Sequence, residues 1–180
     1  SYARPKAGNF VEVDISEAVR ETIKLFRHGP DISENHKITA SVPDEPVVVM
    51  GDSTQIRQIF WNLARNSMNA MPDGGTFNIS LERIPNRRIR ILFSDTGKGM
   101  SPEQVEQLFE PFSNSTTGGT GLGLSIVYQI VRDHNGSISV RSVEEEGTVI
   151  SIELPLENAN KNTPKGTDEN IHDTDSPPLK

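Results

Sequence analysis

The chain has 180 residues, of which 33% are hydrophobic and 24% are charged, and its formal net charge is −7. This length allows one domain with a buried core and additional terminal segments. The negative charge argues against nucleic acid as the main partner, because neutralising phosphates requires a basic surface. The absence of cysteine excludes disulfides and thiolate metal sites. No apolar run approaches the roughly 20 residues that span a bilayer, and no signal peptide begins the sequence, so we expect a cytoplasmic domain.

The predicted secondary structure mixes strands and helices. Short apolar alternations between turn residues predict strands at 10–13, 38–42, 47–50, 76–84, 88–94, 137–142 and 148–154. Helical periodicity and end signals predict helices at about 14–26, 53–71, 102–109 and 123–134. Asp14 with Glu17 suggests a capping box for the first helix, and Asp52 or Ser53 would cap the second.

The order of these elements limits the fold. Hairpins recur, and strands and helices do not alternate strictly as in a doubly wound parallel fold. We therefore expect an α/β (α+β) two-layer sandwich, in which a mostly antiparallel mixed sheet carries helices on one face. Residues 10–156 would form this domain, and residues 1–9 a linker. Residues 110–122 would form a mobile loop rich in Gly, Ser and Thr. Residues 157–180 would be a disordered tail, because they have almost no apolar side chains to bury.

The helix predicted at 53–71 carries two distinct stripes. Apolar residues at helical spacing predict its buried face: Ile56, Ile59, Phe60 and Leu63. Another face carries Asn62, Asn66 and Asn69, with Arg65 beside them. Asparagine costs roughly half a kcal/mol relative to alanine in a helix interior, so helix propensity does not favour three on one stripe. An amide oxygen suits Mg²⁺ and an amide nitrogen can donate to phosphate. The alternative is a solvated face with chance asparagines.

Two glycine-rich turns indicate a nucleotide site. Gly97 and Gly99 directly follow a predicted strand, and the carboxylate of Asp95 could accept a hydrogen bond from an adenine amino group. Residues 118–125 (Gly-Gly-Thr-Gly-Leu-Gly-Leu-Ser) open a helix whose N–H groups offer an anion site. This second turn lacks the Rossmann spacing and the Gly-Lys-Ser/Thr of a Walker A loop. Each turn alone could also be an ordinary turn leading into a helix. The interpretation as a nucleotide site therefore depends on the order in which the motifs occur.

Four motifs in order resemble those of the catalytic, ATP-binding domain of sensor histidine kinases, within the wider gyrase–Hsp90–kinase–MutL group. The asparagine box is matched by residues 62–70 (Asn-Leu-Ala-Arg-Asn-Ser-Met-Asn-Ala), and the first glycine box by residues 95–100 (Asp-Thr-Gly-Lys-Gly-Met). The phenylalanine box is matched by residues 109–112 (Phe-Glu-Pro-Phe), and the second glycine box by residues 119–125. Gly147 and Thr148 also fit. Arg65 and the Phe-Glu-Pro-Phe motif most resemble the nitrogen-regulation and pilus-sensor kinase branch. The resemblance implies the Bergerat ATP-binding fold.

The resemblance implies roles for the matching residues, with ATP and Mg²⁺ as cofactors. Asn66 would ligate the Mg²⁺ that bridges the ATP phosphates, and Asn62 would support it, so these are the expected catalytic residues. Asp95 would accept from the adenine amino group, and Thr148 would lie near the ring. The other ATP contacts would come from the asparagine helix, the two glycine turns and a lid at 110–120: Arg65, Asn69, Gly97, Lys98, Gly99, Met100, Thr117, Gly119, Thr120, Gly121, Leu122, Gly123 and Leu124.

Three positions distinguish this chain within that group. Hydrolytic relatives carry a water-activating glutamate one turn before the metal-binding asparagine, but this chain has Asn62, and an amide cannot act as a general base. This favours phosphoryl transfer to a protein over hydrolysis. The lid usually carries Thr-Thr-Lys, whereas residues 113–118 here contain no lysine. Ser67 occupies a position where alanine is usual, and we interpret it as a tolerated small residue.

The resemblance also implies partners. None of the four histidines, His28, His36, His134 and His172, has the sequence context of a phosphoacceptor, and we interpret them as structural or solvated. The acceptor is therefore expected on a separate dimerisation domain of the same kinase, and a response regulator would receive the phosphate next. The fragment would be monomeric. Its parent would be homodimeric and could be anchored in the inner membrane. The alternatives are an anti-sigma-type serine kinase and a degenerate, non-catalytic docking module.

Overall fold

The computed structural model describes residues 9–109 and 121–157, and the helices and strands predicted from the sequence all lie within this part. In chain order they are β1 (Val11–Asp14), α1 (Ile15–Arg27), β2 (His36–Ser41), β3 (Val48–Gly51), α2 (Ser53–Asn69), β4 (Gly75–Ile84), β5 (Arg88–Asp95), α3 (Pro102–Gln107), α4 (Gly121–Asp133), β6 (Ser137–Val143) and β7 (Gly147–Pro155). Several boundaries differ from the prediction by one or two residues, and at α4 this brings Gly121 and Leu122, expected in a loop, into the first turn of the helix. The rest of that loop and nearly all of the expected linker and tail lie outside the described residues.

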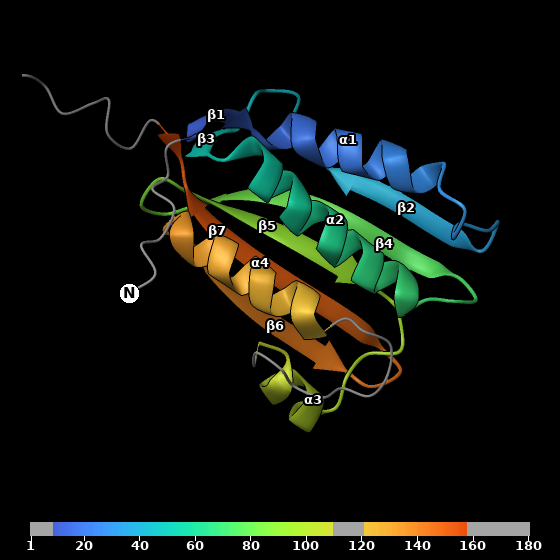
Figure 1. The fold of residues 1–180 in the computed structure, drawn as a ribbon. Helices are drawn as coiled ribbons and strands as arrows, with labels where there is room; N and C mark the ends of the chain where they lie inside the picture. Colours follow the sequence, from blue (N-terminus) through green and yellow to red (C-terminus); the bar gives the residue numbers. More distant parts are fainter. Residues whose placement is uncertain (1–8, 110–120, 158–180) are drawn as a thin grey trace, which may run out of the picture.

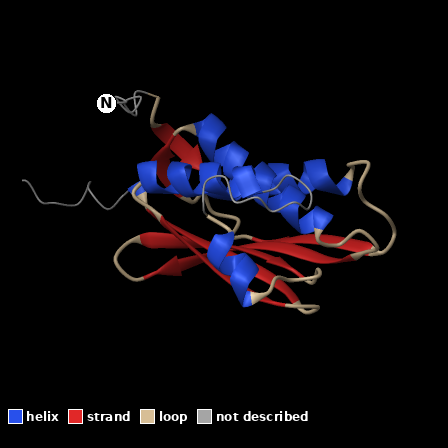
Figure 2. Ribbon diagram, turned by 60° about the horizontal axis from the view of Figure 1, so that its bottom comes forward, coloured by secondary structure: helices blue, strands red, loops and turns tan. Residues whose placement is uncertain are grey.

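Five strands form the main sheet in the order β2-β4-β5-β7-β6. All neighbours are antiparallel except β2 and β4, which pair in parallel. Strands β1 and β3 form a separate antiparallel pair. Helices α1, α2 and α4 lie together on one face of the main sheet, and the short α3 lies beside β6 (Figures 1 and 2). This arrangement confirms the expected two-layer architecture with a mainly antiparallel sheet.

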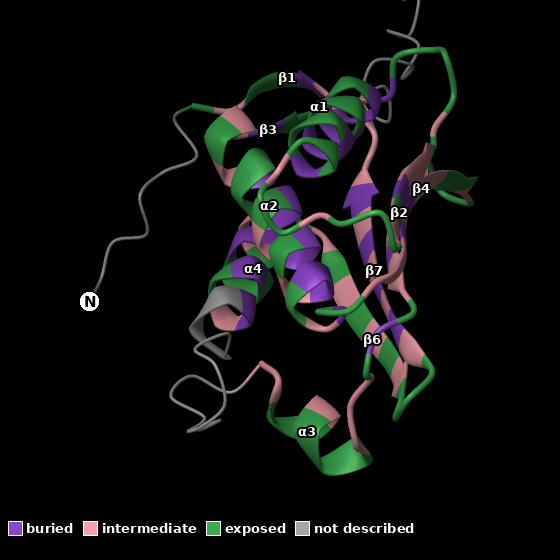
Figure 3. Cartoon of the chain, turned by 90° about the vertical axis from the view of Figure 1, so that its right-hand side faces the viewer, coloured by how far each residue is buried: buried purple, intermediate pink, exposed green. Residues whose placement is uncertain are grey.

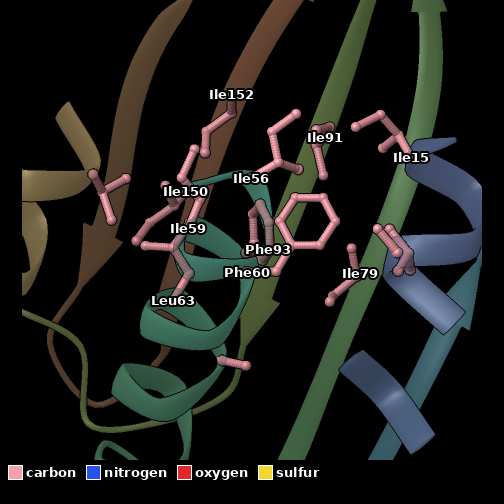
Figure 4. Close-up of a cluster of buried hydrophobic side chains, with 14 of the residues drawn as sticks. Ile15, Ile56, Ile59, Phe60, Leu63, Ile79, Ile91, Phe93, Ile150 and Ile152 are labelled. Atoms are coloured by element: carbon pink, nitrogen blue, oxygen red, sulfur yellow. The ribbon is translucent and has the colours of Figure 1, made fainter. Parts of the chain in front are cut away.

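The core lies between the helical layer and the sheet. Buried residues on the helices and strands face one another there (Figure 3). The predicted apolar stripe of α2 is confirmed, because Ile56, Ile59, Phe60 and Leu63 are all buried. They point toward apolar side chains of β4, β5 and β7 (Figure 4). The rings of Phe60 and Phe93 pack edge to face, with their centroids 5.4 Å apart. Burial of this kind is the main term that holds the two layers together.

Side-chain caps set the helix starts. Asp52 caps α2 by accepting from the backbone N–H of Gln55, and Asp14 caps α1 by accepting from that of Ser16. These caps satisfy backbone donors that an α-helix leaves without a partner. The complete capping box of the described chain is found at α3, where Ser101 and Gln104 exchange both hydrogen bonds. No helix among residues 9–109 and 121–157 is long and apolar enough to cross a membrane.

Candidate functional site

Three segments that are distant in sequence meet at one end of the sheet: the C-terminal half of α2, the end of β5 with the turn after it, and the β6–β7 turn (Figure 1). Strand pairing explains part of this convergence, because Asp95 at the end of β5 lies opposite Thr148 at the start of β7. Hydrogen bonds explain the rest, since they join α2 to both Asp95 and the turn that follows it.

Asp95 is the centre of this cluster. Its Oδ1 accepts from the backbone N–H of Gly97 at 2.9 Å, and its Oδ2 accepts from the hydroxyl of Ser67 at 2.9 Å. One donor comes from the turn after β5 and the other from α2, so the carboxyl group is fixed from two sides. A carboxylate held in this way retains lone pairs that can accept a further hydrogen bond.

Burial raises the pKa of the Asp95 carboxyl above its ordinary value, because desolvation disfavours the charged form. Hydrogen bonds from Gly97, Ser67 and the backbone of Thr148 oppose this effect without cancelling it. A raised pKa in a cluster of polar groups is typical of functional sites. This makes Asp95 a candidate functional residue.

The turn after β5 packs tightly on its neighbours. The N–H of Lys98 donates to the carbonyl of Ala70 at the end of α2, and a Cβ on Gly97 would lie 2.6 Å from that same oxygen. Gly99 has a φ of +64°, and a Cβ there would lie 2.0 Å from the carbonyl oxygen of Val143. Glycine is therefore required at both positions, once for close approach and once for backbone conformation as well.

Ser142 joins this turn to the end of the sheet. Its hydroxyl accepts from the N–H of Met100 at 2.8 Å, lies 2.8 Å from the hydroxyl of Thr148, and is within 3.1 Å of the Gly147 carbonyl, to which it donates. Ser142 thereby ties the turn after β5 to the start of β7, and the Thr148 hydroxyl belongs to the same hydrogen-bond cluster.

The asparagine stripe is only partly buried. Asn62 and Asn66 are half-buried, whereas Arg65 and Asn69 are exposed. Among the described residues, Nδ2 of Asn66 is the buried side-chain nitrogen or oxygen that lacks a hydrogen-bond partner. A buried amide without a partner costs free energy, so a native example calls for an explanation. The chance-asparagine alternative does not supply one for Asn66.

The second glycine turn is described only from the start of α4. Thr117, Gly119 and Thr120, together with the expected lid, lie outside the described residues. Gly121, Leu122 and Gly123 form the first turn of α4, and Leu124 is a buried core residue. Helix α4 packs beside α2, so its N-terminal turn lies at the same end of the molecule as the Asp95 cluster (Figure 1).

The site contains two residues that the sequence motifs did not identify. Ser67 was noted only as a departure from alanine, yet it is buried and bonded to Asp95. Ser142 belongs to none of the motifs. Its sole signal in the sequence is its position in the last hairpin, where it pairs with Thr148.

Comparisons with known proteins agree with this geometry. Residues 51–158 match the family model of histidine kinase-, DNA gyrase B-, and HSP90-like ATPases. Sporulation kinase E of Bacillus subtilis is 32% identical over 154 residues, which cover 86% of this chain but 21% of that kinase. The chain therefore spans about a fifth of that relative's length.

Solved structures extend the likeness to the fold. The catalytic domain of histidine kinase ThkA superposes with a TM-score of 0.72 at 31% identity, covering 81% of this chain and 95% of that one. ThkA in complex with the response regulator TrrA matches with a TM-score of 0.67 at 28% identity, covering 81% and 41%. Full-length ShkA in complex with AMPPNP matches with a TM-score of 0.71 at 27% identity, covering 82% and 31%. This chain belongs to the histidine kinase-, DNA gyrase B- and HSP90-like ATPase family, and within it has the sequence and fold of a histidine kinase catalytic domain.

Proposed function

We propose that this domain binds Mg–ATP and transfers the γ-phosphate to a histidine on a separate dimerisation domain, from which it passes to a response-regulator aspartate. The observation that carries the proposal is the convergence of the fixed Asp95 carboxylate and the Asn66 amide at one end of the sheet. In this proposal Asp95 accepts from the adenine amino group and α2 faces the phosphates. The AMPPNP complex of ShkA supports the nucleotide assignment.

The residues present fit a magnesium ion held jointly with phosphates. No group of three His, Asp or Glu side chains in the described chain is arranged to hold a metal by itself. A metal here would therefore depend on an amide oxygen and on ligand oxygens, a set that Mg²⁺ accepts. Asn66 is the candidate ligand, because one end of its buried amide has no hydrogen-bond partner, and the oxygen and nitrogen of an amide are interchangeable in assignment. A bound Mg²⁺ would neutralise phosphate charge, and Asn62 one turn earlier would support it.

The absence of an acid from this part of α2 favours transfer over hydrolysis. Asn62 lies one turn before Asn66, where an acid would be needed to activate water, and an amide has no basic lone pair for that purpose. Phosphoryl transfer itself needs positioning and charge neutralisation more than a strong base. His36 and His134 do not compete for the phosphate, since both ring nitrogens of each already have hydrogen-bond partners within the fold.

The partners follow from the same assignment. The acceptor histidine is proposed to lie on a dimerisation domain, so that the kinase containing this domain acts as a homodimer. The ThkA complex with TrrA supports a response regulator as the next acceptor. Residues 10–156 would be the catalytic unit, with the linker before it and the tail after it outside the reaction.

Calorimetry with Mg–ATP tests the nucleotide assignment, and transfer from labelled ATP to an added dimerisation domain tests the reaction. We expect binding that needs Mg²⁺ and that Asn66→Ala weakens at least tenfold, because a metal ligand is lost. Gln58→Ala, on the exposed face of the same helix, is the matched control and should bind normally. Absence of binding, or binding indifferent to Asn66→Ala, would favour the docking module. Efficient labelling of this chain by itself would contradict transfer to a separate acceptor.

A further inference from the structure

Ser67 has an unusual hydrogen bond for a serine within a helix. It lies in the last part of α2 and is 5% exposed. A serine in a helix commonly donates back to the carbonyl four residues earlier. Ser67 instead donates to Oδ2 of Asp95, a residue 28 positions later in the chain. The hydroxyl is therefore committed to the candidate adenine reader and does not serve its own helix.

The bond constrains both the orientation and the charge of Asp95. Gly97 donates to one carboxylate oxygen and Ser67 to the other, and the backbone of Thr148 gives a third hydrogen bond. Hydrogen bonds of this kind favour the ionised carboxylate, whereas burial favours the protonated acid. Ser67 is the side-chain donor in this balance, because the other two hydrogen bonds come from backbone N–H groups that substitution cannot remove.

Burial and hydrogen bonding determine the balance between the ionised and protonated forms of Asp95, because the groups in contact with it are uncharged. Its partners across the sheet are Phe77 on β4 and Thr148 on β7, and Ser67 is the contact from α2, so all three are uncharged. The charged residues on the segments that meet around it are all exposed: Lys98 on the turn after β5, Arg65 on the C-terminal half of α2, and Glu144, Glu145 and Glu146 on the β6–β7 turn. The pKa of Asp95 is accordingly set by burial and hydrogen bonds, so the loss of one neutral donor alters its protonation.

The charge state decides which purine is accepted. An ionised carboxylate only accepts hydrogen bonds, so it suits a 6-amino group and opposes a 6-oxo group. A protonated acid can also donate, which would admit the 6-oxo group. The Thr148 hydroxyl, which is hydrogen-bonded to Ser142, lies at the same end of the sheet.

We propose that Ser67 is a positioning residue that sets purine selectivity, by holding Asp95 in the ionised, acceptor-only state that takes a 6-amino purine nucleotide and rejects a 6-oxo one. The proposal rests on the nucleotide assignment made above and deepens it. It also replaces the interpretation of Ser67 as a merely tolerated small residue.

The test compares ATP with inosine triphosphate, which has a 6-oxo group, by calorimetry across pH 5 to 8. Ser67→Ala should weaken ATP binding about tenfold, because Asp95 loses the donor that orients it and favours its ionised, accepting form. It should also move the acid limb of the ATP affinity profile to higher pH and reduce discrimination against inosine triphosphate at acid pH. Thr22→Val is the matched control, because it removes a buried hydroxyl in α1 that donates only to Ala18.

The outcomes separate this inference from the nucleotide assignment. If the wild-type chain binds no ATP, both fail. If wild-type binding depends on Asn66 but Ser67→Ala keeps the wild-type pH profile and purine preference, this inference alone is overturned. An equal loss for both nucleotides at every pH would show a merely structural serine and would also overturn it. Should Ser67→Ala fail to fold, Ser67→Cys, nearly isosteric and a weaker donor, must give the same changes in smaller degree.

Discussion

The imidazole of His134 accepts a hydrogen bond from the backbone N–H of Asp52 at 3.0 Å, and this bond joins the end of α4 to the cap of α2. The other ring nitrogen, Nδ1, donates to the carbonyl of Ile130 at 2.8 Å. The ring also stacks on Phe10 with centroids 4.5 Å apart. His134 therefore joins the two helices that carry the candidate site at the ends that lie away from it. Of the two roles expected for this histidine, structural or solvated, the structure shows the structural one.

Replacement of His134 by alanine should destabilise the domain by about 2–4 kcal/mol. The change removes a buried ring and leaves the Asp52 N–H without its partner. Urea denaturation measures the free energy of unfolding. His28→Ala, at the exposed C-cap of α1, is the control and should change it by less than about 0.5 kcal/mol. Equal effects of the two substitutions would contradict the structural role of His134.

The sequence predicted the elements well and their long-range contacts poorly. The start of α2 and the burial of Phe60 follow from local signals, a capping aspartate and apolar residues at helical spacing. Both hairpins, β4–β5 and β6–β7, follow from short turns between alternating segments. The parallel pairing of β2 with β4 has no such local signal, because the two strands are separated by β3 and α2.

The candidate site divides in the same way. Asp95, Gly97 and Gly99 were found because they form a contiguous motif, and the structure adds the packing that requires the glycines. The bond between Ser67 and Asp95 could not be derived from a pattern, since it depends on how α2 lies against the end of β5. Asp14 shows a further limit of prediction from local patterns. It caps α1 as expected, but its carboxylate also accepts a hydrogen bond from the backbone N–H of Val47, 33 residues later in the chain.

Asp14 should make stability depend on pH. Burial disfavours its ionised form, but hydrogen bonds from the Ser16 hydroxyl and from the backbone of Val47, Glu17 and Ser16 outweigh this and lower its pKa below the ordinary value. The folded state therefore binds this proton more weakly than the unfolded state does. The stabilisation is complete above the ordinary carboxyl pKa and is lost as the pH falls through the lowered value.

Asp14→Ala should consequently reduce the free energy of unfolding by about 1–2 kcal/mol at pH 7, as for other caps. The difference in unfolding free energy between Asp14→Ala and the wild-type protein should narrow below about pH 4. Urea denaturation at several pH values measures this difference. Asp14→Asn is the companion variant, because asparagine caps well but cannot ionise. A gap for Asp14→Ala that stays constant down to pH 2 would contradict the assignment.

Gly99→Ala should damage both stability and nucleotide binding. Alanine at a φ of +64° is strained, and its Cβ would lie 2.0 Å from the Val143 carbonyl oxygen. The β6–β7 turn would have to move, and with it the contact between Ser142 and Met100. We expect a loss of more than about 2 kcal/mol in unfolding free energy. Gly29→Ala, whose nearest contact would be 3.4 Å away, is the control. Wild-type stability and ATP affinity in Gly99→Ala would show that this turn tolerates a side chain.

Asp95→Asn should weaken ATP binding while making the ligand-free domain more stable at neutral pH. The amide removes the acceptor-only carboxylate, and an affinity loss of at least tenfold is expected for a lost bond to a charged group. The stability effect follows from burial, which raises the pKa of Asp95, so that its ionised form is disfavoured in the folded state. The wild-type protein regains this stability as the pH falls through the raised pKa and then below the ordinary value, where Asp95 is protonated in both states. The advantage of Asp95→Asn should therefore be largest near pH 7 and disappear at acid pH, as followed by thermal melts with calorimetry alongside. Lower stability of Asp95→Asn at pH 7 would mean that the carboxylate contributes to the fold through its hydrogen bonds more than its burial costs.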